Sequence, residues 1–112
     1  MSFKVTYTTR FEREAKRLAK KYPSLVEDIL KLIELLKEEP FQGVPLGKNL
    51  YKIRIAIESK GTGKSGGARI ITYVVASRNT VYLTSIYDKS EQDNVSTIIL
   101  LKLLKQEGII SK

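Results

Sequence analysis

Six cationic side chains fall between residues 48 and 69, and only Glu58 opposes them. They are Lys48, Lys52, Arg54, Lys60, Lys64 and Arg69. Like charges gathered on a sheet repel one another, so such a cluster needs an explanation. One explanation is a phosphate-binding surface. The alternative is a solvated face on which long side chains keep their charged ends in water.

Alternation along one segment predicts how these cations are positioned. Tyr51, Ile53, Ile55 and Ile57 take one side of a strand over 51–57 and pack against helices, while Lys52 and Arg54 share the other side. A second strand is predicted over 68–76 by its β-branched residues. Because consecutive strands are often neighbours, we expect Arg69 to lie beside Lys52 and Arg54.

The composition excludes several kinds of chemistry. The 112 residues include no Cys and no His, which removes the thiolate nucleophile, the usual acid–base residue and the commonest metal ligands. The run Gly61-Thr62-Gly63-Lys64-Ser65 fails as a nucleotide-binding loop, because Glu58 stands where that motif needs glycine. Helix capping explains the clustered carboxylates, so no metal site and no cofactor are expected.

The net charge of +8 attracts polyanions, so nucleic acid, an anionic membrane and an acidic protein are candidate partners. A soluble domain that happens to be basic is the plain alternative. The N-terminal residues contain no apolar signal segment, and Lys102 interrupts the most apolar run, 98–101. We therefore expect a cytoplasmic protein that does not enter a membrane.

The remaining pattern predicts one domain over residues 1–112. A short strand over 3–7 precedes two amphipathic helices, which begin at the capping boxes Thr9–Glu12 and Ser24–Glu27. Residues 41–49 read as a loop, a tight turn at 77–79 precedes a strand over 80–87, and a last helix runs from Ser90 to about Glu107 with Gly108 as its C-cap. The order β-α-α-β-β-β-α is an α+β fold, with helices packed on a mostly antiparallel sheet.

Three segments together resemble the RelE/ParE toxin superfamily. They are 51–54 (YKIR), 66–74 (GGARIITYV) and 81–91 (VYLTSIYDKSE), and the loop 59–67 (SKGTGKSGG) resembles most the HigB branch of RelE-like toxins. The resemblance implies a toxin of a type II toxin–antitoxin system that enters the ribosomal A site and cleaves mRNA as a metal-independent endoribonuclease. It also implies a compact sheet with two N-terminal helices.

The resemblance also assigns candidate catalytic residues. The basic pair of the family's strand falls on Lys52 and Arg54, its central-strand arginine on Arg69, and its basic residue after the last strand on Lys89, with Tyr87 nearby. The chain departs from the family pattern in two ways. The second strand lysine is Arg54 here, and the family's C-terminal tyrosine has no clear match near 95–96.

RNA carries its own nucleophile, the 2′-hydroxyl, so the protein can act by orienting the strand and stabilising charge on the phosphate. A guanidinium bonds two phosphate oxygens at once, which suits Arg54 and Arg69. Neighbouring cations disfavour an ammonium, so Lys52 is the candidate general base, and Lys89 or Tyr87 the candidate acid. Further RNA contacts are expected from the cations outside this set, Lys48, Lys60, Lys64 and Arg78.

The expected partners are mRNA on the ribosome and an antitoxin, whose acidic or amphipathic segment covers the basic face or displaces the last helix. Seven apolar residues between 95 and 104 make that helix either a packed core element or a patch covered by the partner. Two other functions remain open. They are a ParE-like poison of DNA gyrase and a non-catalytic module that binds nucleic acid with a steep salt dependence.

Overall fold

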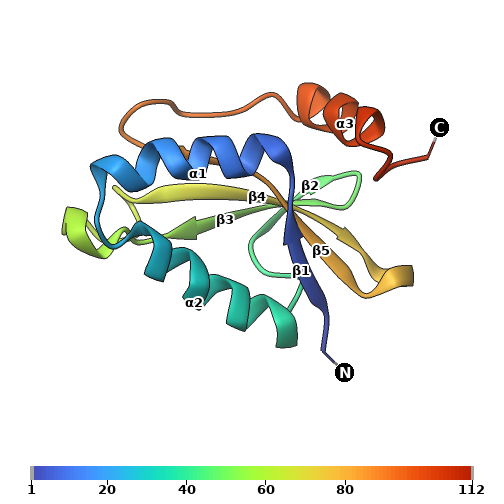
Figure 1. Ribbon diagram of the computed structural model, residues 1–112, viewed down its shortest axis with the longest axis horizontal. Coiled ribbons are helices and arrows are strands. Elements are labelled where there is room, and N and C mark those ends of the chain that lie inside the picture. The colour runs from blue at the N-terminus through green and yellow to red at the C-terminus, as the bar shows by residue number, and fades with distance from the viewer. Residues whose placement is uncertain (1, 112) are drawn as a thin grey trace.

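A five-stranded sheet in the order β1-β5-β4-β3-β2 is the centre of the molecule (Figure 1). The computed structural model describes residues 2–111. Its elements are β1 (Lys4–Tyr7), α1 (Thr9–Lys21), α2 (Leu25–Glu38), β2 (Val44–Gly47), β3 (Leu50–Ile55), β4 (Ala68–Val75), β5 (Thr80–Asp88) and α3 (Thr97–Gln106). Two short 3₁₀ turns, η1 (Glu58–Lys60) and η2 (Ala76–Arg78), join strands.

The pairing of the strands confirms the α+β fold with a mostly antiparallel sheet. Strands β2 to β5 pair antiparallel in sequence, whereas β1 pairs parallel with β5. One expectation was wrong, because part of the predicted loop 41–49 is the edge strand β2. Lys48 and Asn49 both have positive φ, 56° and 66°, and form the two-residue turn that pairs β2 with β3.

The helix caps differ from the predicted capping boxes in their bonding. The hydroxyl of Thr8, one residue before the predicted cap, accepts a hydrogen bond from the Phe11 N–H at 3.2 Å and begins α1. Ser24 does precede α2, but its hydroxyl donates to the Asp28 carboxylate at 2.8 Å, accepts from the Ser59 N–H at 2.8 Å and caps no N–H of the helix. Local spacing therefore locates both helices to within a residue, without identifying the groups that cap them.

The last helix begins later than predicted. Ser96 caps α3 by accepting from the Ile99 N–H at 3.2 Å, and the helix starts at Thr97 rather than near Ser90. The Ser90 hydroxyl instead donates to the buried carboxylate of Asp88 at 2.8 Å and accepts from the Lys60 ammonium at 3.0 Å. Gly108 follows the helix with φ 76°, as expected of the residue that ends a helix in the left-handed conformation.

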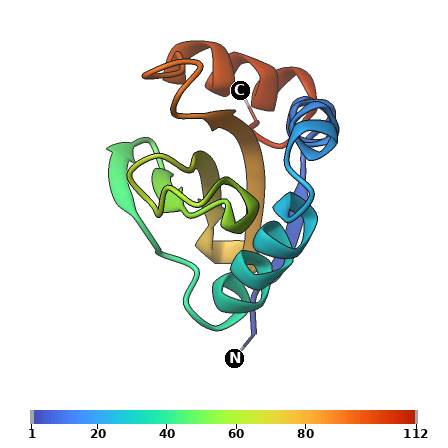
Figure 2. The same ribbon diagram turned by 90° about the vertical axis from the view of Figure 1, so that its left-hand side faces the viewer.

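Two apolar cores lie on the two faces of the sheet. Helices α1 and α2 cover the inner face, where Leu18, Leu25 and Ile70 are fully buried (Figures 1 and 2). On the outer face a smaller core joins α3 to β3 and β4 and consists of Leu50, Ile71, Leu100 and Leu104. Burying such a side chain stabilises the fold by about 1.5–3 kcal/mol. The predicted alternation of β3 is confirmed, since Ile53 and Ile55 belong to the inner core.

Helix α3 combines the two alternatives left open for it. Leu100 and Leu104 are buried against the sheet, but Ile98 is 75% exposed and Ile99 is 50% exposed. One side of the helix is therefore a core element, and its first turn presents apolar surface. No helix of the described chain has the length and apolar character needed to cross a membrane.

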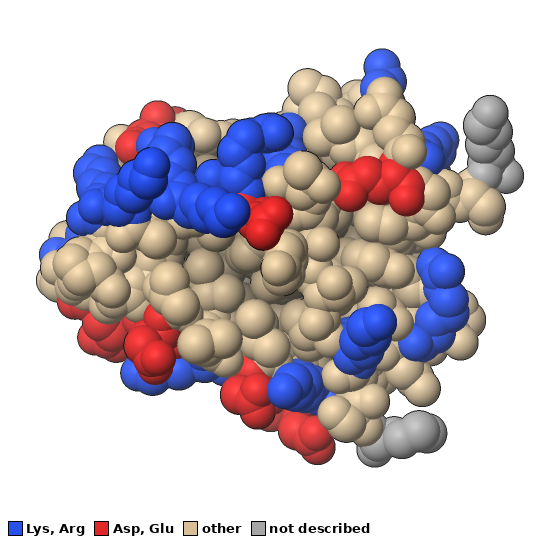
Figure 3. Space-filling model, viewed as in Figure 1, with Lys and Arg blue, Asp and Glu red and all other residues tan. Residues whose placement is uncertain are grey.

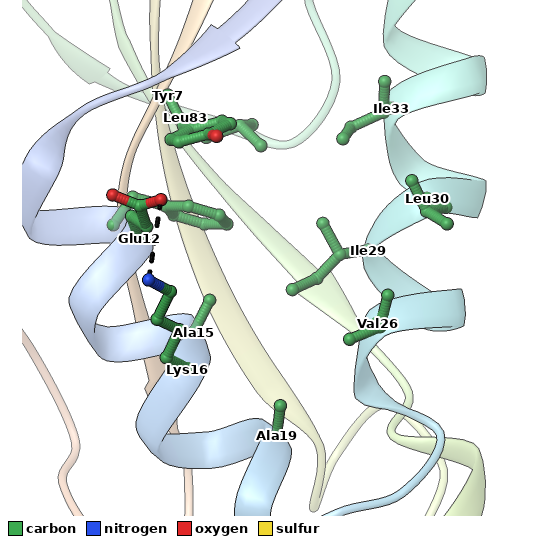
Figure 4. A pocket seen from close by; sticks show the side chains of 11 residues that line it. Tyr7, Glu12, Ala15, Lys16, Ala19, Val26, Ile29, Leu30, Ile33 and Leu83 are labelled. Carbon is green, nitrogen blue, oxygen red and sulfur yellow. Dashed lines mark ion pairs between the residues drawn. The ribbon is translucent and has the colours of Figure 1, made fainter.

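A mostly apolar hollow of about 250 Å³ separates α1 from α2. Figure 4 shows Ala15 and Ala19 of α1 facing Ile29 and Ile33 of α2 across it. Its charged lining residues are Glu12 and Lys16, which form an ion pair at 3.8 Å. The ammonium and carboxylate in this lining are paired with each other, and none of the predicted site residues lines the hollow, so the candidate site lies elsewhere.

Candidate active site

Three predicted site residues form one row across the sheet. Arg54 on β3 lies directly opposite Arg69 on β4, and Arg69 lies directly opposite Tyr87 on β5. Directly opposite residues share a face, with Cβ atoms about 4.5–5.5 Å apart. Lys52 lies two residues from Arg54 on the same face, the outer one. The expectation that Arg69 lies beside Lys52 and Arg54 is therefore confirmed.

An open hollow of about 660 Å³ collects three of the predicted cations, Lys52, Arg54 and Lys64. It lies between α2, β2 and the part of β3 that extends beyond β2. Within residues 2–111 none of these three cations forms an ion pair. They are free to receive the oxygens of an external anion.

Two carboxylates also line this hollow, but they do not neutralise its cations. Asp28 is buried and accepts hydrogen bonds from the Ser24 hydroxyl at 2.8 Å and from the Glu58 N–H at 3.2 Å. Glu58 is exposed and forms no ion pair within the described residues. These acids belong to α2 and η1, whereas Lys52, Arg54 and Lys64 belong to β3 and the loop 61–67.

Arg69 lies in the row, but its guanidinium is directed at the backbone. The side chain is 6% exposed and donates to the carbonyls of Lys64 at 2.9 Å, Ala68 at 3.2 Å and Ser65 at 3.4 Å. Gly67 packs closely on β3, since a Cβ there would lie 2.0 Å from the Ile55 carbonyl oxygen. In this structure Arg69 holds the loop that carries Lys64, rather than pointing into the hollow.

Tyr87 and Lys89 differ in accessibility. Tyr87 is 2% exposed, and its hydroxyl donates to the Asp93 carbonyl at 3.3 Å. Burial raises the pKa of Tyr87, and the opposing effect of the nearby Arg69 is smaller. The Lys89 ammonium is half-buried and pairs with the exposed Asp93 carboxylate at 3.0 Å. Lys89 is therefore the more accessible proton donor.

Lys60 does not belong to the outer face. Its ammonium donates to the Asp88 carboxylate at 2.7 Å and to the Ser90 hydroxyl at 3.0 Å, and it lies over the Tyr22 ring. Asp88 lies opposite Ala68, a member of the inner core, so this pair is on the helix side of the sheet. The expected RNA contact by Lys60 is not supported, because its charge is already neutralised inside the protein.

The buried, charged carboxylate of Asp88 is a feature that the sequence did not reveal. Its side chain has no exposed surface and accepts hydrogen bonds from the Tyr22 hydroxyl, Lys60, and both the N–H and hydroxyl of Ser90. Burial alone would raise the pKa of Asp88, but these bonds outweigh burial and hold the pKa well below its ordinary value. The sequence suggested only an acid near a helix start, because the partners come from distant segments.

The last two predicted cations lie at the other end of the sheet. Lys48 is in the turn between β2 and β3, and Arg78 is in the turn between β4 and β5. Because β3 begins where β4 ends, both turns are remote from the Arg54–Arg69 row. Arg78 donates to the Ile109 carbonyl at 3.2 Å, near the end of α3. The nine predicted residues thus do not form one surface.

The fold is shared with solved toxin structures. A double-mutant form of the E. coli toxin RelE in the free state matches with a TM-score of 0.61 and 16% identity, over 95% of this chain and 98% of that one. The isolated E. coli RelE toxin matches with a TM-score of 0.56 and 19% identity, over 96% and 99%. The toxin–antitoxin complex RelBE2 from Mycobacterium tuberculosis matches with a TM-score of 0.60 and 18% identity, over 79% and 92%. The architecture is therefore that of a RelE-like toxin.

The sequence itself identifies the family. The family model described as the RelE toxin of the RelE / RelB toxin-antitoxin system matches residues 3–106, almost the whole chain. The chain belongs to this family, whose toxins are ribosome-dependent mRNA endoribonucleases.

Proposed function

We propose that this chain cuts mRNA in the ribosomal A site, and that Lys52, Arg54 and Lys64 hold the scissile phosphate. The observation that carries the proposal is the hollow beside β3, which is lined by these three cations and by Lys31, none with a carboxylate partner in the described residues. A bidentate guanidinium and two ammonium groups suit the oxygens of a phosphodiester. Arg54 is exposed and is the guanidinium suited to direct contact.

The reaction uses the ribose of the message as its nucleophile. The 2′-hydroxyl loses its proton to a general base, its oxygen bonds to the adjacent phosphorus, and the bond to the 5′-oxygen breaks. The products are a 2′,3′-cyclic phosphate and a 5′-hydroxyl, which takes its proton from a general acid. Negative charge grows on the phosphate oxygens in the transition state, where fixed cations stabilise it most.

Lys52 and Lys89 take the two proton-transfer roles in this proposal. Lys52 is half-buried on the same face as Arg54 and takes the role of general base, since it lies beside the group that holds the phosphate. Lys89 is the acid, because Tyr87 is buried and already donates to a carbonyl. Arg69 acts indirectly by holding the Lys64 loop against β3. Such a site contributes charge but little positioning of a flexible strand, which fits an enzyme that needs the ribosome to present its substrate.

The finer assignment to the HigB branch rests on the loop 59–67. It carries Lys64 into the hollow, and Gly67 permits its close approach to β3. The partner in this proposal is a RelB-like antitoxin, since the M. tuberculosis relative is a toxin–antitoxin complex. Exposed Ile98 and Ile99 of α3 offer apolar surface to such a partner. An enzyme acting on ribosomes works in the cytoplasm.

Primer extension on translating ribosomes tests the proposal. The unmodified chain should produce discrete cuts in ribosome-bound message, and little cutting of the same RNA without ribosomes. Arg54→Ala should lower the cleavage rate about 10²–10³-fold, the usual effect of removing one donor to a developing oxyanion. Lys4→Ala is the matched control, since Lys4 is exposed on the opposite edge strand, and it should cut normally.

Two results would reject the proposal. Equal cleavage activity of Arg54→Ala and Lys4→Ala would show that the hollow does not hold the scissile phosphate. Inhibition of gyrase supercoiling by the purified chain, with intact message on ribosomes, would instead assign the ParE-like function.

A further inference from the structure

A second cationic surface lies along α1. The helix carries six cations, Arg10, Arg13, Lys16, Arg17, Lys20 and Lys21, against the two acids Glu12 and Glu14. Figure 3 shows Lys and Arg gathered along this helix, whereas Asp and Glu gather below it, over α2. Helix α1 packs on the inner face of the sheet, against β5. Its cationic surface is therefore separate from Lys52 and Arg54, which lie on the outer face.

The cations of α1 are only partly paired within the helix, by Arg10 with Glu14 and by Lys16 with Glu12. Arg13 and Arg17 are four residues apart, as are Lys16 and Lys20, and like charges at that spacing destabilise a helix. Helix α2 shows the contrasting arrangement, with Lys31 four residues after Glu27 and Lys37 bonded to Glu34 at 2.7 Å. Both helices contain pairs of opposite charge, but only α1 also carries an excess of four cations that the two acids of the helix do not balance.

Few of the cations on α1 are firmly neutralised. Arg13 and Lys20 are exposed and form no ion pair within residues 2–111. Lys16 lies 3.8 Å from Glu12, and Arg17 lies 2.8 Å from Glu91, with 75% and 59% of the two basic side chains exposed. Exposed pairs of this kind contribute little and exchange readily for another anion.

The four cations Arg13, Lys16, Arg17 and Lys20, here called the α1 ridge, follow one face of the helix. At 1.5 Å per residue they span about 10 Å, long enough to face several backbone phosphates. The exposed positions of α1 hold no apolar or aromatic side chain, so the ridge cannot insert into a membrane or bury an amphipathic protein segment. It also lacks the aromatic side chains on which single-stranded bases stack.

We propose that the α1 ridge is a second RNA-binding surface, which takes the phosphate backbone of folded ribosomal RNA while the hollow beside β3 receives the message. Folded RNA is recognised largely through its backbone and shape, which suits long cationic side chains on a rigid helix. This proposal rests on the proposed function, because it assumes that the ribosome is the place of action. It assigns binding to the ribosome and cutting of the message to different faces of the molecule.

Binding to purified ribosomes over a range of salt concentrations tests the ridge. A labelled Arg54→Ala chain serves as the parent, so that the message stays intact. The double variant Arg13→Glu with Lys20→Glu is compared with the control Lys4→Glu with Lys105→Glu. The control changes the net charge equally at exposed cations that form no ion pair in the described residues. Thermal unfolding of each chain verifies that it is folded.

The ridge variant should bind at least about tenfold more weakly than the control, and its log–log salt slope should be shallower by about 2, one for each lost phosphate contact. An equal loss of ribosome affinity in both variants would show that only net charge matters, and would overturn the proposal that the α1 ridge binds RNA. Loss of antitoxin binding with normal ribosome binding would overturn it in favour of an acidic protein. Failure of the parent to bind ribosomes would instead reject the proposed function on which the ridge rests.

Discussion

Two groups of cations lie on opposite faces of the same end of the sheet, and their carboxylate partners distinguish them. On the inner face Lys60 is paired with Asp88 at 2.7 Å and Lys21 with Glu91 at 3.4 Å. On the outer face Lys52, Arg54 and Lys64 have no such partner in the described residues, although the sequence places Lys60 and Lys64 in one loop. A basic residue next to another in sequence can therefore stabilise the fold while its neighbour is available to a ligand.

The largest expected effect comes from removing the centre of the inner group. Asp88→Ala should lower the free energy of unfolding by about 4 kcal/mol, because Lys60 is left as a mostly buried charge without a partner and the Tyr22 hydroxyl without an acceptor. Denaturant unfolding measures the change. A loss below about 1 kcal/mol, typical of an exposed pair, would show that the inner group does not stabilise the fold as described.

Lys60 and Lys64 offer the sharpest comparison between the faces. Lys60→Ala should lower the free energy of unfolding by about 2 kcal/mol, since Asp88 keeps its bonds from Tyr22 and Ser90. Lys64→Ala should change stability by less than about 0.5 kcal/mol, because its side chain is exposed and unpaired among the described residues. It should instead slow ribosome-dependent cleavage about tenfold, or about 1.4 kcal/mol. A loss of stability in Lys64→Ala with unchanged stability in Lys60→Ala would contradict the distinction between the two faces.

Acid should weaken the inner group selectively. Because the folded state lowers the pKa of Asp88, its contribution to stability is complete above the unfolded pKa of about 3.9 and is lost as the pH falls below it. The loss should approach about 1.4 kcal/mol for each pH unit below that value. Unfolding curves of the unmodified chain and of Asp88→Asn at several pH values isolate this group, and the two should converge at low pH. A constant difference would argue against the inferred ionisation.

The smallest expected effect concerns Tyr87. Tyr87→Phe removes one hydrogen bond at 3.3 Å and should cost about 1 kcal/mol of stability or less. Cleavage on ribosomes should fall by less than about threefold, because Lys89 and not Tyr87 is the proposed proton donor. A loss of a hundredfold would transfer the acid role from Lys89 to Tyr87. Lys89→Ala provides the companion measurement.

The sequence predicted best what depends on neighbouring residues. The alternation over 51–57 located Lys52 and Arg54 on the outer face, and the pairing of consecutive strands brought Arg69 opposite Arg54. The four-residue strand β2 was missed because Gly43, Pro45 and Gly47 read as breakers, although β3 offers it a pairing edge. Short edge strands owe their existence to their partner more than to their own residues.

What the sequence could not supply was the bonding between distant segments. Asp88 and Lys60 are 28 residues apart, and Asp88 and Tyr22 are 66 apart. Nothing in the local pattern indicated that Lys60 would be paired and Lys64 unpaired in the described residues. Nor did it indicate that the Arg69 guanidinium would donate to carbonyls of the preceding loop. Which cations are free is decided by tertiary contacts, because each carboxylate can satisfy only the groups that the fold brings to it.

The parallel pairing of β1 with β5 has a consequence for synthesis. Lys4 lies beside Thr80, so the first strand waits for its neighbour until more than two thirds of the chain has been made. Contacts this distant in sequence are costly to close and form slowly. A growing polypeptide that has not yet reached residue 88 lacks the strand that anchors α1 and borders the Arg69 strand. A nascent chain therefore cannot complete the sheet that carries Arg54, Arg69 and Tyr87 until β5 has been made.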